Sequence, residues 1–150
     1  MITLFEDFKF YKTGTPIVYS SIVLDSYSKD LLLSKFIYND SIYSSWIKIC
    51  DHMTICLGGL PEHIKRYWLD EEVTLTVTEF GTSDKAVAVK VTGFFNIDKP
   101  ELTDGPSFPH ITLAINPIDA KPADSNRIVD WQIIDPLIVK GIVTEIKSNL

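Results

Sequence analysis

The sequence carries one six-residue pattern twice, first as His52-Met53-Thr54-Ile55-Cys56-Leu57 and again as His110-Ile111-Thr112-Leu113-Ala114-Ile115. Both copies read histidine, large apolar, threonine, branched apolar, small, branched apolar. Alternate side chains of a strand share a face, so each copy predicts a strand with histidine, threonine and the small residue on one face. The three larger apolar side chains are expected to pack behind that face.

A single His-x-Thr pattern in an apolar strand most simply indicates a hydrogen-bonded histidine followed by a strand-forming threonine. Two copies change this interpretation. The chain has only three histidines, and two of them begin matching segments. The repeat therefore favours a functional pair.

The remaining apolar patterns predict an α+β domain. We expect a first helix capped by Ser26 or Ser28, and a hairpin whose turn is 81–84. The predicted helical segments are 26–38, 61–68 and a turn at 125–131, and the predicted strands are 17–24, 47–57, 73–78, 86–95, 110–116 and 137–146.

Composition limits the class of protein. The 150 residues are 45% hydrophobic and 23% charged, which fits one globular domain over 1–150. The net charge of −6 argues against a protein that binds long duplex nucleic acid. The sequence has no apolar run long enough for a membrane span and no signal-peptide pattern at its start, so we expect a cytoplasmic protein with no membrane partner.

The two cysteines, Cys50 and Cys56, lie in one predicted strand, about 20 Å apart at ~3.3 Å per residue. That separation is too large for a disulfide, so both are expected to be reduced core thiols. The sequence also lacks the ligand spacings typical of metal sites. We therefore expect no metal and no other cofactor.

The paired motif suits phosphodiester chemistry. The ordinary pKa of histidine, about 6.5, allows one copy to accept a proton while the other donates one near neutral pH. A threonine hydroxyl two residues later can donate a hydrogen bond to a non-bridging phosphate oxygen. The four residues expected to act together are His52, Thr54, His110 and Thr112.

In these two motifs the chain resembles the 2H phosphoesterase superfamily, which carries paired His-x-Thr or His-x-Ser motifs on strands of two lobes. The resemblance implies two pseudo-symmetric lobes with antiparallel strands around a central cleft and helices outside. It also implies a phosphodiesterase with His52 and His110 as general acid and base. Within the superfamily the chain looks most like bacteriophage anti-CBASS enzymes, which hydrolyse 3′-5′ linkages of small cyclic oligonucleotide messengers in the host cytoplasm.

Two other functions remain open at this stage. The same site could act on 2′,3′-cyclic phosphate ends in RNA repair or end processing. A different class of function is a non-catalytic sponge that binds a nucleotide messenger without cleaving it.

Substrate binding is expected to use aromatic rings for the bases and nearby cations for the phosphates. Tyr11 lies between Lys9 and Lys12 beside a Thr-Gly-Thr turn, and Arg66 and Trp68 follow the first motif closely. These five residues are the candidate substrate-binding residues.

Other conspicuous residues receive less specific roles. We assign Trp46 and Trp131 to packing and His63 to the surface. Asp51 precedes His52, but adjacent strand residues face opposite sides, so it is not expected to orient that imidazole. The long segment 98–109 is expected to border the cleft and to act as its lid.

Overall fold

The computed structural model describes residues 16–93 and 108–148. The chain runs in the order β1 (Ile17–Leu24), α1 (Ser26–Phe36), η1 (Ser41–Tyr43), β2 (Ile47–Lys48), β3 (His52–Leu57), α2 (Glu62–Trp68), β4 (Glu72–Thr82), β5 (Ala86–Gly93), β6 (His110–Ile115), η3 (Pro122–Arg127) and β7 (Asp130–Lys147). The predicted α+β class is confirmed, with strands predominating.

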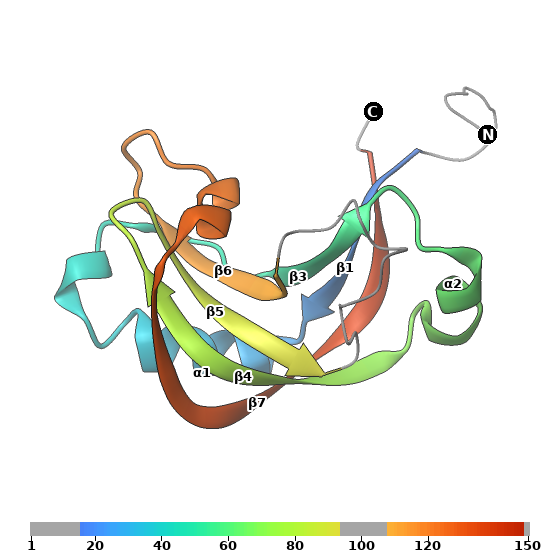
Figure 1. Cartoon of the computed structure of the whole chain (residues 1–150), viewed down its shortest axis with the longest axis horizontal. Coiled ribbons are helices and arrows are strands. Elements are labelled where there is room, and N and C mark those ends of the chain that lie inside the picture. The colour runs from blue at the N-terminus through green and yellow to red at the C-terminus, as the bar shows by residue number, and fades with distance from the viewer. Residues whose placement is uncertain (1–15, 94–107, 149–150) are drawn as a thin grey trace.

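The strands form a closed antiparallel β-barrel (Figure 1). The sheet order is β2-β6-β3-β1-β7-β4-β5, and a further pairing of β5 with β6 closes the circuit. The longest strand, β7, pairs with β4 over its first part and with β1 over its last part. The two copies of the repeat, β3 and β6, become neighbours in this barrel.

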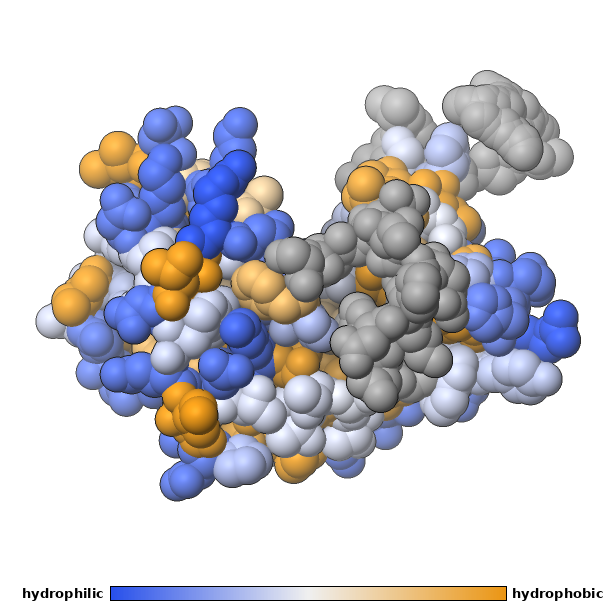
Figure 2. All heavy atoms as spheres, in the orientation of Figure 1, coloured by the Kyte–Doolittle hydropathy of each residue, from blue (hydrophilic) through white to orange (hydrophobic). Residues whose placement is uncertain are grey.

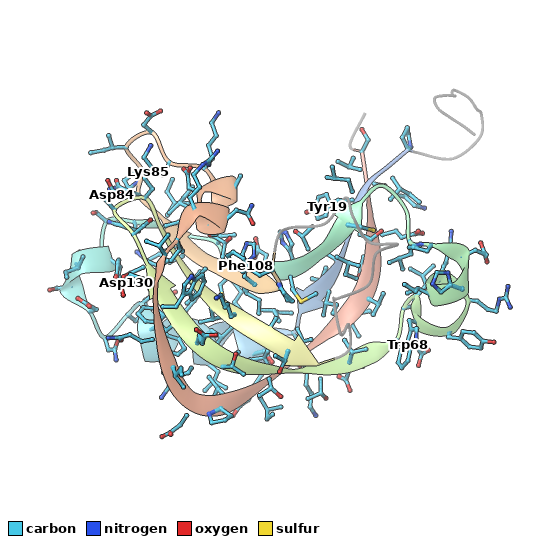
Figure 3. All side chains as sticks on the ribbon, in the orientation of Figure 1. Tyr19, Trp68, Asp84, Lys85, Phe108 and Asp130 are labelled. Atoms are coloured by element: carbon cyan, nitrogen blue, oxygen red, sulfur yellow. The ribbon has the colours of Figure 1, made fainter. Side chains whose placement is uncertain are left out.

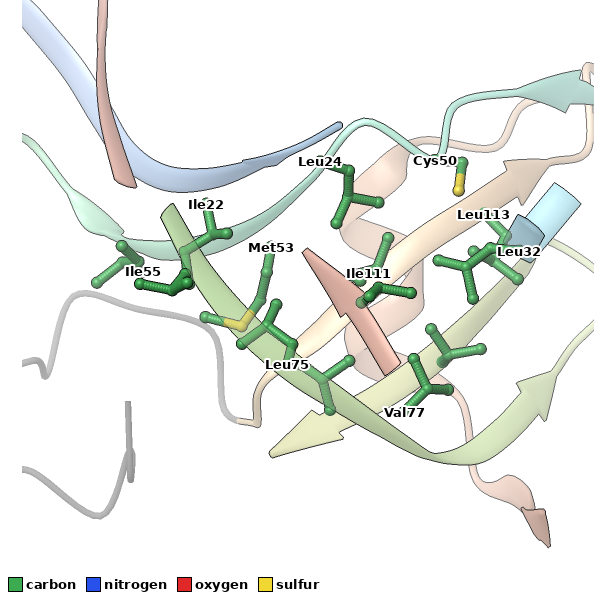
Figure 4. Packing of buried hydrophobic residues seen from close by; sticks show 14 of the residues in the cluster. Ile22, Leu24, Leu32, Cys50, Met53, Ile55, Leu75, Val77, Ile111 and Leu113 are labelled. Carbon is green, nitrogen blue, oxygen red and sulfur yellow. The ribbon is translucent and has the colours of Figure 1, made fainter. Parts of the chain in front are cut away.

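Buried apolar side chains fill the interior of the barrel (Figure 4). Alternation along each strand supplies them, since every second residue of a strand points inward. Helix α1 adds Leu32 and Leu33 to the same core. The barrel strands contribute Ile22, Met53, Ile55, Leu75, Val77, Val89, Val91, Ile111, Leu113, Val139 and Val143.

Two local predictions differ from the structure. The strand predicted over 47–57 is interrupted at Cys50, which adopts a positive φ of 47° and separates β2 from β3. Helix α1 is capped by Asp25, whose carboxylate accepts the Ser28 backbone N–H at 2.7 Å. The Ser28 hydroxyl instead accepts the Lys140 backbone N–H at 2.8 Å, so this serine ties the helix to β7.

Other elements match the predictions with shifted ends. The 3₁₀ segment η3 begins at Pro122 rather than 125, and β7 begins at Asp130 rather than 137. The hairpin between β4 and β5 is present, and β4 continues to Thr82, inside the predicted turn. Cys50 and Cys56 are buried free thiols, as expected.

Within the described residues, no helix combines the length and apolar character needed to cross a membrane.

Candidate active site

The two His-x-Thr motifs meet where β3 crosses β6. Met53 lies opposite Ile111 in the antiparallel register, and both side chains are buried in the core. Continuing that register by one residue along β3 brings Thr54 opposite His110. In the other direction the register shifts toward β2, where Lys48 lies opposite Ala114 and the Cys50 N–H donates to the Thr112 carbonyl at 2.9 Å, so Thr112 lies beside the stretch 50–52 that ends in His52. The four predicted residues therefore form a two-by-two group on the outer face of the barrel.

A local twofold axis relates the two motifs. Any antiparallel strand pair has such an axis normal to the sheet, and here it passes between Met53 and Ile111. The next strand outward is β1 beside β3 and β5 beside β6. The sequence repeat is thus also a repeat in space over these four strands. Beyond them the two sides of the barrel differ, because β1 is followed by β7 and β5 by β4.

Both copies contain a β-bulge at the same position of the repeat. The β1–β3 register passes from Ser21↔Thr54 to Ser20↔Cys56, which leaves Ile55 as an extra residue. The β5–β6 register passes from Ala88↔Thr112 to Val87↔Ala114, which leaves Leu113 as an extra residue. Each extra residue is the fourth in its copy of the pattern.

The bulges correct the predicted alternation in the second half of each copy. One extra residue reverses the faces of all that follow. Cys56 and Ala114 consequently join the core instead of sharing a face with the histidines. Leu57 turns outward and is 64% exposed, while Ile115 joins a small outer cluster with Ala86 and Ala88.

His110 has a fixed ring orientation. Its Nδ1 lies 3.0 Å from the carbonyl oxygen of Phe108, which can only accept, so Nδ1 carries the proton of this hydrogen bond. The other ring nitrogen, Nε2, is then the one that exchanges a proton when the ring is neutral. The side chain is 8% exposed, and this burial lowers the pKa of His110, with the hydrogen bond to Phe108 opposing the shift.

His52 is half-buried, and its ring centroid lies 5.4 Å from that of Tyr19. Burial is the main cause that lowers the pKa of His52, the positive charge of His110 lowers it further, and the charge of Asp51 opposes both. Asp51 itself pairs with Lys29, with Oδ1 and Nζ 2.8 Å apart. The effect of His110 on the pKa of His52 agrees with the placement of the two imidazoles in one group.

The two threonines have different surroundings. The Thr112 hydroxyl lies 2.8 Å from the hydroxyl of Ser125, a fully buried residue of η3. Thr54 is half-buried and lies opposite Ser21 on β1. The Ser21 hydroxyl is buried and has no hydrogen-bond partner in the described part of the chain. The threonine on β6 is therefore tied to the scaffold, whereas the threonine on β3 has an unsatisfied hydroxyl beside it.

The predicted substrate-binding residues do not gather at this group. Arg66 and Trp68 are exposed on α2. Figure 3 shows Trp68 on α2 at one end of the molecule, whereas Phe108, which precedes the second motif, lies near the middle. Lys9, Tyr11 and Lys12 lie outside the described residues, as does 98–107, most of the predicted lid.

Three residues near the histidines were not among the candidate site residues, although one of them, Phe108, belongs to the segment 98–109 that was expected to border the cleft. Tyr19 contacts the His52 ring, and the Phe108 ring lies 5.1 Å from the His110 ring. Lys90 lies directly opposite His110 in the β5–β6 register. One signal for Lys90 was present in the sequence, because it is the one charged residue in the apolar run Ala86–Val91.

Trp131 combines the predicted packing role with a position at the edge of the site. Its ring packs on the small outer cluster, and its indole N–H donates to the Ile128 carbonyl at 3.0 Å. The same ring meets Phe108 edge-on, with centroids 5.4 Å apart. Trp46, in contrast, packs only against the core and Tyr43 among the contacts described.

The surface is hollowed between the part that carries η3 and the part that carries the ends of β1 and β7 (Figure 2). Figure 3 places Phe108 between these two parts and Tyr19 on the β1 side. The histidine group thus has an aromatic ring on each side. Among the residues described, no three His, Cys, Asp or Glu side chains come together in a group that could hold a metal ion.

No family model matches the sequence, and no curated protein matches it.

Proposed function

We propose that the protein is a phosphodiesterase of the 2H type, with His52 and His110 as proton carriers and Thr54 and Thr112 as phosphate-binding residues. The observation that carries this proposal is the β3–β6 pairing, which brings together two His-x-Thr motifs that are far apart in the sequence and relates them by a local twofold axis. An incidental strand histidine has no reason to be duplicated in sequence, in facing direction and in the bulge that follows it.

The reaction divides into two proton transfers. One histidine takes the proton of the attacking hydroxyl, which on a ribose 3′-5′ linkage is the neighbouring 2′-hydroxyl. The O2′–P bond forms and the P–O5′ bond breaks, while the other histidine gives its proton to O5′. The products are a 2′,3′-cyclic phosphate end and a free 5′-hydroxyl, and water opens the cyclic phosphate by the same exchange with the roles reversed.

The threonine hydroxyls support this reaction by donating to the non-bridging oxygens, where negative charge is concentrated. Thr54 lies opposite His110, and Thr112 lies beside the stretch 50–52 that ends in His52, so one hydroxyl is near each proton carrier. Because the arrangement has twofold symmetry, either histidine can serve as the base.

The electrostatics of the free site explain how substrate activates it. Burial lowers the pKa of both histidines, so the unliganded site is mainly uncharged at neutral pH. A bound phosphodiester places a negative charge beside both rings and raises their pKa values. The protonated form that the leaving oxygen requires is thus favoured once substrate is bound.

Small cyclic oligonucleotides are the proposed substrates. The proposed biological role is degradation of these messengers in the host cytoplasm, as in the phage anti-CBASS enzymes that the chain resembles. The net charge of −6 supports a short ligand, since affinity for long nucleic acid depends on many phosphate contacts. In the proposed architecture, the β1 and β5 sides of the barrel are the two lobes and the hollow of Figure 2 is the cleft between them.

The test is to compare His52→Ala and His110→Ala with His63→Ala, which removes the third histidine from the exposed face of α2. The substrates are cyclic di- and trinucleotides, 2′,3′-cyclic mononucleotides and a short RNA, with products identified by mass. We expect each site variant to lose at least ~10²-fold in kcat while His63→Ala retains activity.

Other outcomes identify other functions. Full activity in a folded His52→Ala or His110→Ala variant rejects the two-histidine mechanism. Cleavage restricted to 2′,3′-cyclic phosphate ends indicates RNA end processing, and recovery of intact cyclic ligand after denaturation indicates a sponge. Activity that disappears with EDTA indicates metal-dependent chemistry.

A further inference from the structure

Lys90 places a positive charge at one side of the histidine group. Residues directly opposite each other on antiparallel strands share a face, so Lys90 lies on the same outer face as His110. It is half-buried. Among the residues that the structure describes, no carboxylate lies within ion-pair distance of its ammonium. A partly desolvated cation that pairs with no carboxylate of the described residues favours an anionic ligand.

Two aromatic rings fix the position of this ammonium. Its Nζ lies 4.5 Å from the Trp131 ring centroid and 5.1 Å from that of Phe108. Phe108 is also the residue whose ring and carbonyl contact His110. The cation–π contacts hold a normally flexible side chain at the edge of the site, so that little conformational freedom remains to be lost on binding.

Among the residues that the structure describes, the position on the other side of the twofold axis that corresponds to Lys90 carries no cation. The residue opposite His52 on β1 is Val23, which is the counterpart of Lys90 on β5. Within the described part of the chain, the histidines and threonines are duplicated, whereas the positive charge opposite a histidine is present only on the β5 side. Lys90 therefore gives the symmetric site a direction.

The location of Lys90 also determines which phosphate it can reach. The row Thr54, His110, Lys90 crosses three neighbouring strands, each about 4.8 Å from the next. Lys90 thus lies on the far side of His110 from Thr54, and its ammonium is held toward the rings of Phe108 and Trp131. A phosphate centred between the histidines and threonines would leave this ammonium available for a second anionic group.

We propose that Lys90 binds a second phosphate, adjacent to the one cleaved, and so selects ligands with at least two phosphodiesters over those with one. This inference rests on the proposed function for the position of the cleaved phosphate. It assigns the neighbouring nucleotide to the β5 side of the site, with its phosphate on the Lys90 ammonium.

The test measures binding in a His52→Ala background, which keeps the ligand intact. The probes are a cyclic dinucleotide of two adenylates and adenosine 2′,3′-cyclic monophosphate, titrated calorimetrically. Lys90→Met removes the charge and retains the apolar stem. Lys85→Met is the matched control, because it removes a cation from the exposed end of the same hairpin. Lys90→Arg retains the charge.

We expect Lys90→Met to raise the Kd of the cyclic dinucleotide about tenfold or more, the effect of losing a hydrogen bond to a charged group. The Kd of the mononucleotide should change less than about twofold by the same reasoning. Lys85→Met should leave both unchanged, and Lys90→Arg should retain the preference for the dinucleotide. Near-ultraviolet circular dichroism and the unfolding midpoint verify that each variant is folded.

Several results would overturn the inference: an equal loss for both ligands, no loss for either, an equal effect of Lys85→Met, or no binding of the dinucleotide to the parent. Turnover by the parent with His52 intact is measured separately. Absence of turnover rejects the proposed function, while the difference between the two Kd values still decides the role of Lys90.

Discussion

Replacing Thr112 by valine separates the contribution of the Thr112 hydroxyl to folding stability from its contribution to catalysis. The Thr112 hydroxyl is 2.8 Å from the hydroxyl of Ser125, and Ser125 is fully buried. Thr112→Val keeps the shape of the side chain and leaves the Ser125 hydroxyl without this partner. An unsatisfied buried hydroxyl costs about 1–3 kcal/mol.

The equivalent change at Thr54 is the control. Thr54 has the same place in the other motif but is half-buried, and no hydrogen bond from its hydroxyl is seen among the described residues. We expect Thr54→Val to cost less than about 0.5 kcal/mol, as for substitutions away from buried networks. At this chain length, 1 kcal/mol corresponds to about 2–4 °C in Tm, so Thr112→Val should lower Tm by several degrees.

Urea unfolding and thermal scans of four proteins provide the assay: the parent, Thr112→Val, Ser125→Ala and the double variant. When both hydroxyls are removed, neither is left buried without a partner. The double variant should therefore be more stable than the sum of the two single losses predicts. Both threonine variants should lose about tenfold in kcat, since each removes one hydrogen bond to the phosphate. Equal stability of Thr112→Val and Thr54→Val, or strict additivity in the cycle, would refute the reasoning.

Three further predictions concern pH, packing and substrate length. Burial lowers the pKa of His52 and His110, so the unfolded chain binds protons more readily than the folded protein. The contribution of the two histidines to stability should be complete above about pH 6.5 and should be lost as pH drops through the lowered pKa values. The urea midpoint of a His52→Gln/His110→Gln variant should therefore depend less on pH. Gly141→Ala should destabilise by about 1–3 kcal/mol, since its Cβ would lie 2.6 Å from the Val23 carbonyl oxygen and 2.7 Å from Ile22 Cγ2; an unchanged thermal midpoint would contradict this. Cyclic di- or trinucleotides should be cleaved with much higher kcat/KM than a single-stranded RNA of about 20 nucleotides and with a shallow salt dependence, whereas faster cleavage of the RNA would favour RNA processing.

The sequence was sufficient to predict the strands of the repeat and the shared face of each His-x-Thr pair. It was not sufficient to predict which face the residues after each threonine occupy. The reason is that a bulge depends on the register with the neighbouring strand. Nothing in Ile55 or Leu113 themselves indicates an extra residue. The break at Cys50 has the same origin. β2 pairs with β6 and β3 pairs chiefly with β1, and Cys50 between them adopts a positive φ.

The residues around the histidines were harder to predict than the histidines. Arg66 and Trp68 follow the first motif in sequence, but the turn after β3 carries the chain to α2, away from the β3–β6 crossing. Lys90 is distant from His52 in sequence and reaches the site through the β5–β6 register. Sequence proximity is a poor guide here because neighbours on adjacent barrel strands come from separate segments.

The crossing of β3 and β6 has a mechanical consequence. Met53↔Ile111 is the one registered residue pair between these strands, whereas β4 and β7 are paired from Glu72↔Ile142 to Thr82↔Asp130. Past this pair, the same edge of β6 is held by β2 and by the Cys50 N–H, which donates to the Thr112 carbonyl at 2.9 Å, so the β3–β6 contact beside the histidines is a short seam in the barrel wall. A phosphate that accepts hydrogen bonds from hydroxyls of both strands would link β3 to β6 across this short contact. Amide hydrogens beside it should then exchange with solvent more slowly while the ligand is bound.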